Sequence, residues 1–273
     1  VFLPGLAVVL SAAGWRSVSA TVACAALGML PLVFLFMRNW PQDIGLAPYG
    51  DTVVDKPVQP PRGNFINQTL GALADGLKSR DYLLLAGTFF ICGFSTNGLI
   101  GTHLIPACID AGIGEVVAAS VLASMAIFNF FGTTGSGWLS DRYDNRVLLS
   151  IYYGLRGISL IILPFSFVSF YGLTLFAVFY GLDWFATVPP TVKLVSRMYG
   201  KERAPIMFGW LMCIHQVGGA SAAFSAGALR MELGTYLQSF VLSGALCLVA
   251  AIIALMIRIE PEAREPRAVP QPG

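Results

Sequence analysis

The sequence predicts an all-α membrane protein, a polytopic bundle of transmembrane helices. Of the 273 residues, 56% are hydrophobic and only 12% are charged, and the mean hydropathy is +0.70. A soluble domain carries about 25% charged residues, so a surface this apolar would not remain dissolved in water. The apolar residues also occur in long runs, and a helix needs about 20 of them to cross a bilayer core about 30 Å thick.

Eight apolar segments meet or approach this length. Residues 1–13 are too few to cross a membrane, and we interpret them as the end of a helix that begins upstream, in an N-terminal part missing from this chain. Seven segments are long enough to span the bilayer. They are residues 17–37, 82–107, 116–136, 147–168, 173–195, 205–229 and 236–257.

One connection is long, whereas the others are short and turn-like. It covers residues 38–80 and is rich in proline, which predicts an irregular linker. At its end, Leu70, Leu73 and Leu77 follow a helical spacing, which predicts a short amphipathic helix on the membrane surface. The predicted organisation has four parts. They are residues 1–37 with the last one or two spans of a first half, the linker 38–80, a six-helix bundle over 81–258, and a tail over 259–273.

Lysine and arginine indicate the orientation of these spans. Most of them lie in the linker, in the loop at 137–146, in the loop around 193–203 and in the tail, whereas the alternate loops carry only Arg16 and Arg230. Because basic residues collect in cytoplasmic loops, we expect the linker, the loop at 137–146 and the C-terminus to face the cytoplasm of a plasma or inner membrane.

The composition argues against several other classes of protein. A net charge of +2 gives no electrostatic footprint for nucleic acid. The five cysteines form no C-x-x-C pair, so we expect no metal or cofactor and interpret them as small packing residues. An intramembrane enzyme is a weaker alternative, because neither H-E-x-x-H nor G-x-S-x-G occurs. The seven full spans also allow a non-transporting receptor, against which the partial helix and the long linker argue.

The loop at 137–146 reads "GWLSDRYDNR", and this pattern resembles the cytoplasmic signature of the major facilitator superfamily. Gly137, Asp141, Arg142 and Arg146 match that pattern, whereas Asp144 stands where the family usually has glycine. "GWR" at 14–16 resembles the family's turn between spans five and six, and "PQDIGLAPYG" at 41–50 resembles the segment after span six. The resemblance implies the second six-helix half of a transporter, preceded by the end of the first half, with the remainder of that first half as its partner.

Two further stretches resemble one branch of that family. "GLDWFATVPPTVKL" and "FGWLMCIHQVGGA" are similar to spans ten and eleven of the monocarboxylate and oxalate/formate-type branch, although residues 116–136 lack the basic residue that this branch often carries in span eight. The resemblance implies secondary transport of a small solute by alternating access, coupled to protons, and the similarity to this branch points to an organic acid or monocarboxylate as the solute. It also implies that the signature loop is a conformational latch in which Asp141 pairs with neighbouring helix ends in one state. A loop that only sets the topology is the alternative.

Three ionisable residues lie inside predicted spans, where such groups are functional candidates by default. Arg156, Asp183 and His215 each lie about 14–15 Å from the start of their span at 1.5 Å per residue, which places them near the membrane midplane. Asp183 is the best candidate for a proton carrier, because burial disfavours the ionised carboxylate and makes protonation accessible. A static ion pair between Asp183 and Arg156 is the competing interpretation.

Other polar residues of the spans have two interpretations each. His215 with Gln216, and also Asn97 and Asn129, supply groups either for the transport cavity or for hydrogen bonds between helices. Trp184 lines a substrate wall or only packs, and His103 lies at the outer membrane interface or forms an outer gate. Proline predicts bends at residues 106 and 189–190, and the small residues of "QVGGASAAFSAGA" predict close helix packing.

Overall fold

The computed structural model describes residues 3–38, 41–47, 65–167 and 170–258. In these residues it contains helices and no strand, as the predicted all-α fold class requires. The chain divides into two compact units, Pro4–Gln68 and Thr69–Gly273, and each is described by itself. The predicted tail 259–273 and residues 39–40 and 48–64 of the predicted linker lie outside the described residues.

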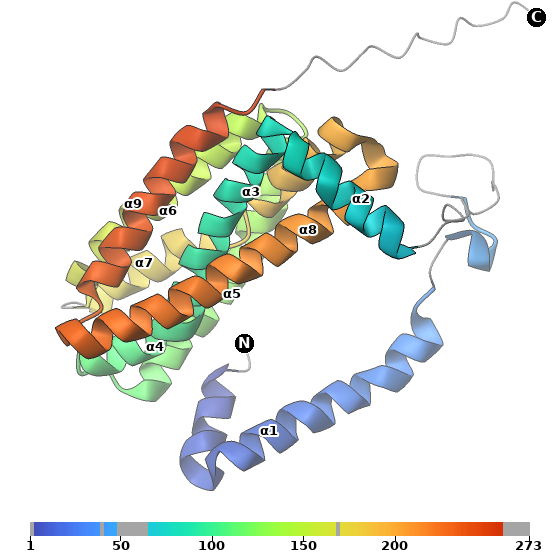
Figure 1. The fold of residues 1–273 in the computed structure, drawn as a ribbon. Helices are drawn as coiled ribbons and strands as arrows, with labels where there is room; N and C mark the ends of the chain where they lie inside the picture. Colours follow the sequence, from blue (N-terminus) through green and yellow to red (C-terminus); the bar gives the residue numbers. More distant parts are fainter. Residues whose placement is uncertain (1–2, 39–40, 48–64, 168–169, 259–273) are drawn as a thin grey trace, which may run out of the picture. The chain divides into compact units, whose positions relative to one another are not determined.

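The first unit consists mainly of α1, Leu3–Phe36 (Figure 1). The helix is interrupted at Gly14, whose φ of 76° is a left-handed conformation that glycine adopts at no steric cost. This interruption lies where the sequence predicts a turn between two spans. The second part of α1 is apolar on all sides, which is typical of a membrane-spanning helix. A short 3-10 helix, η1 (Pro41–Ile44), follows.

The predicted amphipathic helix before the bundle is present as α2, Phe65–Lys78. Its small residues Ala72 and Gly76 are buried against the bundle, whereas Leu70 and Leu77 are exposed. Two contacts with α8 hold it in place. The Trp210 indole donates to the carbonyl of Thr69 at 2.9 Å, and Arg203 pairs with Asp75 at 2.6 Å, a hydrogen bond that lowers the pKa of Asp75.

The first span of the bundle is a single apolar stretch from Arg80 to Asp110 that is built from three helical pieces. They are α3 (Arg80–Gly93), the π-helical segment η2 (Phe94–Ile100) and α4 (Gly101–Asp110). The sequence predicts this span at 82–107 but not its π-helical centre. Such segments are rare and occur frequently at functional sites.

Three further spans agree with the predicted ranges. They are α5 (Glu115–Ser140), α6 (Asn145–Ser166) and α9 (Leu237–Leu255). Residues 141–144 form the tight connection between α5 and α6. The α6 and α9 helices lie side by side in Figure 1, and Gly157 and Gly244 let their backbones meet. A Cβ atom on either glycine would lie 2.7 Å from the carbonyl oxygen of the other.

The sequence predicts one span over 173–195 with a bend at 189–190, and the structure instead has a break a few residues earlier. α7 covers Phe170–Asp183, residues 184–187 form turns, and α8 then begins at Val188 and continues to Leu233. Pro189 and Pro190 lie in the first turn of α8, where a helix needs no backbone N–H donor. The helix therefore breaks just before the prolines instead of bending at them.

The α8 helix is 46 residues long, or about 69 Å at 1.5 Å per residue. This is more than twice the bilayer core, and a non-helical Gly200 with φ 76° divides it. The described residues contain six helical stretches long and apolar enough to cross a membrane, and one of these, Tyr171–Leu233, holds both the break at 184–187 and the kink at Gly200. That stretch accounts for two of the predicted spans.

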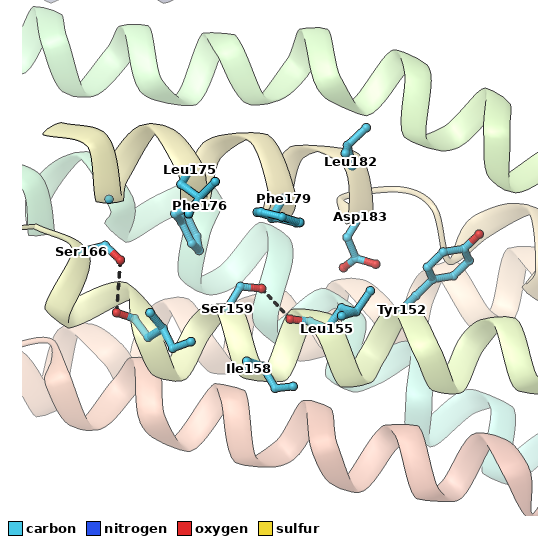
Figure 2. Close-up of a pocket in the computed structure, with 12 residues that line it drawn as sticks. Tyr152, Leu155, Ile158, Ser159, Ser166, Leu175, Phe176, Phe179, Leu182 and Asp183 are labelled. Atoms are coloured by element: carbon cyan, nitrogen blue, oxygen red, sulfur yellow. Dashed lines mark hydrogen bonds between the residues drawn. The ribbon is translucent and has the colours of Figure 1, made fainter. Parts of the chain in front are cut away.

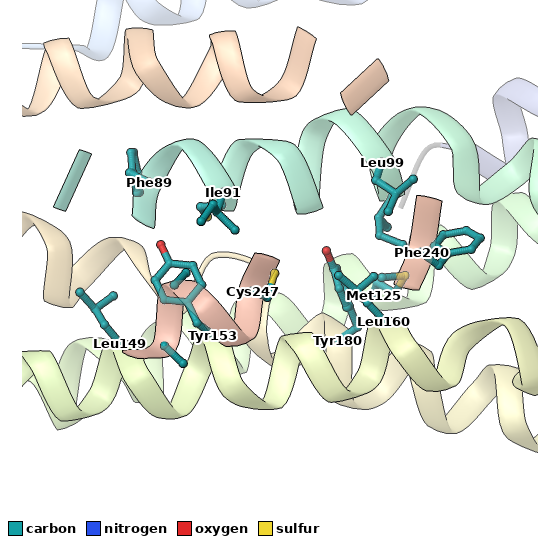
Figure 3. Close-up of a cluster of buried hydrophobic side chains, with 14 of the residues drawn as sticks. Phe89, Ile91, Leu99, Met125, Leu149, Tyr153, Leu160, Tyr180, Phe240 and Cys247 are labelled. Atoms are coloured by element: carbon teal, nitrogen blue, oxygen red, sulfur yellow. The ribbon is translucent and has the colours of Figure 1, made fainter. Parts of the chain in front are cut away.

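A continuous apolar core joins the helices of the second unit (Figure 3). Phe89, Met125, Tyr153, Leu160 and Phe240 are completely or almost completely buried in it. Many large apolar side chains instead face outward. A surface of this kind would make a soluble protein aggregate, whereas in a bilayer it faces lipid. The chain is therefore an integral membrane protein.

Candidate functional site

The centre of the candidate site is a buried ion pair between α6 and α7. The Arg156 Nε atom lies 2.5 Å from Asp183 Oδ2, and the two side chains are 0% and 7% exposed. Arg156 occupies the middle of the 22-residue helix α6, and Asp183 is the last residue of α7. Figure 2 shows the Asp183 carboxylate pointing from α7 toward α6. The two predicted midplane residues are thus brought together.

Arg156 also binds the backbone at the break after α7. Its Nη2 atom donates to the carbonyl oxygens of Asp183 at 2.7 Å and Trp184 at 3.0 Å. Its Nη1 atom donates to the Cys92 thiol at 3.1 Å, and that sulfur lies 3.4 Å from the Thr187 hydroxyl. The guanidinium group therefore holds the start of the break and contacts Cys92 of α3, whose thiol in turn contacts Thr187 at the end of the break.

Side chains of α5 bind two further backbone groups of the break. The Phe185 backbone N–H donates to the Asn129 side-chain oxygen at 3.1 Å, and the Ser136 hydroxyl donates to the carbonyl of Ala186 at 2.5 Å. Within a bilayer, an irregular backbone is tolerated only where protein or enclosed water satisfies its polar groups. The break at 184–187 meets this condition through side chains of α5 and α6.

The sequence points to some of these residues and not to others. Asn129 is a predicted polar candidate, and the structure places it on the helix break. Cys92 and Ser136 were not predicted, because a cysteine and a serine among apolar residues look like packing residues. Trp184 lies in the break itself and packs on Tyr180, with 5.9 Å between the ring centroids.

A second group of predicted residues gathers on one exposed face of the bundle. The Asn97 amide donates to Gln216 Oε1 at 3.2 Å, and His215 Nδ1 lies 3.2 Å from the same oxygen. Asn97 comes from the π-helical segment η2 and Gln216 from α8, and both are exposed. His215 is buried beneath them, with its ring 5.0 Å from that of Phe89. Two exposed amides and a buried imidazole thus meet between η2 and α8.

His103 is buried, whereas the sequence favours an interfacial position. Its Nε2 atom lies 2.9 Å from the carbonyl of Ala223, and its Nδ1 atom lies 3.2 Å from the Tyr236 hydroxyl. The ring therefore bridges α4, α8 and the start of α9.

The signature loop makes contacts with the ends of two other helices. Asp141 forms an ion pair with Lys193 of α8, and both side chains are about half exposed. Arg142 stacks over Trp138 with 4.0 Å between the guanidinium carbon and the ring centroid. A Cβ atom at Gly137 would meet nothing within 4 Å, so the packing of this unit does not require glycine there.

Arg146 and Asp144 form a separate cluster at the start of α6. Asp144 caps this helix by accepting a hydrogen bond from the Arg146 backbone N–H at 2.9 Å. The Arg146 guanidinium lies 2.6 Å from the same carboxylate, and this side-chain hydrogen bond lowers the pKa of Asp144. Arg146 also donates to the carbonyl of Ile257, just beyond the end of α9, at 3.0 Å. Aspartate at position 144 therefore has a structural use that glycine would lack.

A groove with a volume of about 690 Å³ lies between α6 and α7 (Figure 2). Its walls are largely apolar, and Asp183 belongs to its lining. The lining residues are Tyr152, Leu155, Ile158, Ser159, Ile162, Ser166, Gly172, Leu175, Phe176, Phe179, Leu182 and Asp183. Among the described residues, no group of three or more His, Cys, Asp or Glu side chains is arranged to hold a metal ion.

Comparison with known proteins identifies the family. The family model described as Major Facilitator Superfamily matches residues 1–223 and 87–273, so this chain belongs to that superfamily. Monocarboxylate transporter 13 of Rattus norvegicus is 32% identical over 157 residues, which cover 57% of this chain and 36% of that protein. Monocarboxylate transporter 11 of Homo sapiens is 28% identical over 285 residues, which cover 99% of this chain and 54% of that protein.

These comparisons confirm the predicted family and the similarity to its monocarboxylate branch. A third relative, Monocarboxylate transporter 12-B of Danio rerio, is 27% identical over 183 residues, which cover 66% of this chain and 38% of that protein. The chain thus spans between about a third and just over half of the length of these relatives.

Proposed function

We propose that this chain is part of a secondary active transporter that moves a small organic acid by alternating access, coupled to protons. In this proposal residues 1–37 end the first half of the transporter, 38–80 link the halves, and 81–258 form the second half. The linker, the signature loop and the tail 259–273 face the cytoplasm of a plasma or inner membrane. The basic residues of these segments and the family membership support this arrangement.

The observation that carries the proposal is the Arg156–Asp183 pair at a helix break in the middle of the bundle. Transporter sites lie near the bilayer midplane and are typically formed by discontinuous helices. Charged groups at that depth are costly and mark ion pathways or substrate sites. The break supplies the discontinuous helix, and the pair supplies the charged groups.

The geometry suggests how proton and anion binding are coupled. Asp183 Oδ2 is held by Arg156, whereas Asp183 Oδ1 has no hydrogen-bond partner among the described residues. A proton bound at Oδ1 neutralises the carboxylate and weakens its attraction for Arg156. The guanidinium is then available to a carboxylate substrate, for which its planar donors are well suited. The exposed amides of Asn97 and Gln216 would contact the substrate before it reaches Arg156.

Replacing Asp183 by asparagine tests this function. In proteoliposomes that contain the full-length protein and a radiolabelled short-chain monocarboxylate, we expect accumulation driven by a proton gradient to be lost, because asparagine carries no titratable proton. Asp110→Asn is the control, since Asp110 pairs with Arg230 at 2.8 Å in an exposed position. If Asp183→Asn retains accumulation and its pH dependence, the pair is static and the proton-carrier assignment is wrong.

We further propose that the signature loop is a latch closed by Asp141 and Lys193. Such an exposed pair contributes at most about 1 kcal/mol to stability, so its function would lie in biasing two conformations. We expect Lys193→Gln to slow initial uptake at least fivefold while leaving the thermal unfolding temperature nearly unchanged. The exchange of both charges, Asp141→Lys with Lys193→Asp, should restore much of the rate.

Removal of a comparable ion pair provides the control for the latch. Asp75 of α2 forms an exposed pair with Arg203 of α8, outside the signature loop, and Asp75→Asn breaks this pair. Equal slowing of uptake by Asp75→Asn and Lys193→Gln would show that any lost surface charge has this effect, and that Asp141–Lys193 is not a latch.

A further inference from the structure

The groove between α6 and α7 is elongated and apolar. Along α6 its lining extends from Tyr152 to Ser166, or about 21 Å at 1.5 Å per residue. Phe176 and Phe179 of α7 form the opposite wall and point toward α6 in Figure 2. Its volume of about 690 Å³ falls within the range of small-molecule sites.

A buried hydrogen-bond acceptor lies among these apolar walls. Asp183 is 6% exposed, and its Oδ1 atom has no partner among the described residues. Ser159 and Ser166 offer no comparable group, because their hydroxyls already donate to carbonyl oxygens of α6. The groove is therefore long and apolar, and one of its lining residues, Asp183, has a buried carboxylate oxygen without a hydrogen-bond donor among the described residues.

We propose that this groove binds a long-chain alcohol, with its alkyl chain along α6 and α7 and its hydroxyl donating to Asp183 Oδ1. The charge of Asp183 is already balanced by Arg156 at 2.5 Å, so the ligand must be neutral. An ammonium group would add an unbalanced charge inside the membrane, which is costly. A hydroxyl group supplies the hydrogen-bond donor without adding a charge. A single alkyl chain suits the elongated shape of the groove.

The bound alcohol would inhibit transport. It would occupy the carboxylate oxygen to which the proposed function assigns the proton, so this consequence rests on the proposed function. Binding itself does not, because it requires only the groove and the unpartnered oxygen. A binding assay and a transport assay therefore separate the two proposals.

Binding is tested with tritiated 1-tetradecanol and the full-length protein in nanodiscs, by scintillation proximity. Unlabelled 1-tetradecanol and its methyl ether are the competitors, because the ether keeps the chain but lacks the donor. A hydrogen bond to a charged group contributes about 1.5–3 kcal/mol, so we expect the ether to compete roughly tenfold or more weakly. Equal competition by the ether would overturn the proposal.

Matched serine variants locate the binding site. Ser159→Phe places a ring in the groove and should weaken tetradecanol binding at least tenfold. Ser120→Phe is the control, since Ser120 is an exposed residue of α5 whose hydroxyl likewise donates within its own helix. Equal binding by the two variants would also overturn the proposal. The two proposals can fail separately. If the unaltered protein binds tetradecanol and Asp183→Asn retains proton-driven uptake, the groove is supported and only the proton-carrier assignment is refuted.

Discussion

Replacing Arg156 by methionine is expected to lower the free energy of unfolding by about 3–5 kcal/mol, the usual cost of breaking a buried ion pair. The change leaves the Asp183 carboxylate buried without its partner. It also removes the donors to the carbonyl oxygens of Asp183 and Trp184 at the helix break. Thermal unfolding of the detergent-purified protein, followed by size-exclusion chromatography, measures the effect.

Two further variants show whether buried charge is the cause. In Arg156→Met with Asp183→Leu no unpaired charge remains, so we expect most of the lost stability to return. Recovery should be incomplete, because the two carbonyl oxygens still lack their donor. Arg230→Met breaks a partly exposed pair and should cost no more than about 1 kcal/mol. If Arg156→Met and Arg230→Met unfold alike, the ion pair does not stabilise the bundle.

Gly132→Ala is the second change with a large expected effect. A Cβ atom at Gly132 would lie 1.8 Å from the backbone carbonyl oxygen of Leu182, so α5 and α7 would have to separate. Overpacking of this kind costs about 1–3 kcal/mol and occasionally more. Because Leu182 precedes Asp183, we expect the same change to displace the ion pair and reduce uptake. The unfolding temperature and the initial uptake rate are the measurements.

Gly135→Ala is the matched control on the same helix. A Cβ atom there would meet nothing within 4 Å. Alanine is a better helix former than glycine by about 1 kcal/mol, so this variant should be neutral or slightly more stable. Similar destabilisation at residues 132 and 135 would refute the contact between α5 and α7 as the cause.

The spans were predictable because each one is determined by its own local sequence. A run of apolar residues specifies a helix in lipid whatever its neighbours are, and the glycine at position 14 marks a turn on the same local basis. Depth in the membrane also follows from counting along a helix. For this reason the sequence places Arg156 and Asp183 at the same level before any contact between them is known.

The helix break at 184–187 was not predictable in this way. The prolines at 189 and 190 predict that the helix is bent or interrupted nearby. The position of the break, however, depends on hydrogen-bonding groups that Asn129, Ser136 and Arg156 supply from other helices. Those partners are distant in sequence and adjacent only after packing. The same reason explains why Lys193 was not foreseen as the partner of Asp141, and why Cys92 was interpreted only as a packing residue.

The ion pair also has a consequence for biosynthesis. Arg156 precedes Asp183 by 27 residues in the chain, so α6 leaves the ribosome before its counter-charge does. At the centre of a helix an arginine raises the apparent free energy of translocon insertion by about 2.5–3.5 kcal/mol. Until α7 is inserted, the unfavourable free energy of placing Arg156 in the bilayer is not offset by Asp183. The other residues of α6 must therefore be apolar enough to keep this helix in the bilayer during that interval.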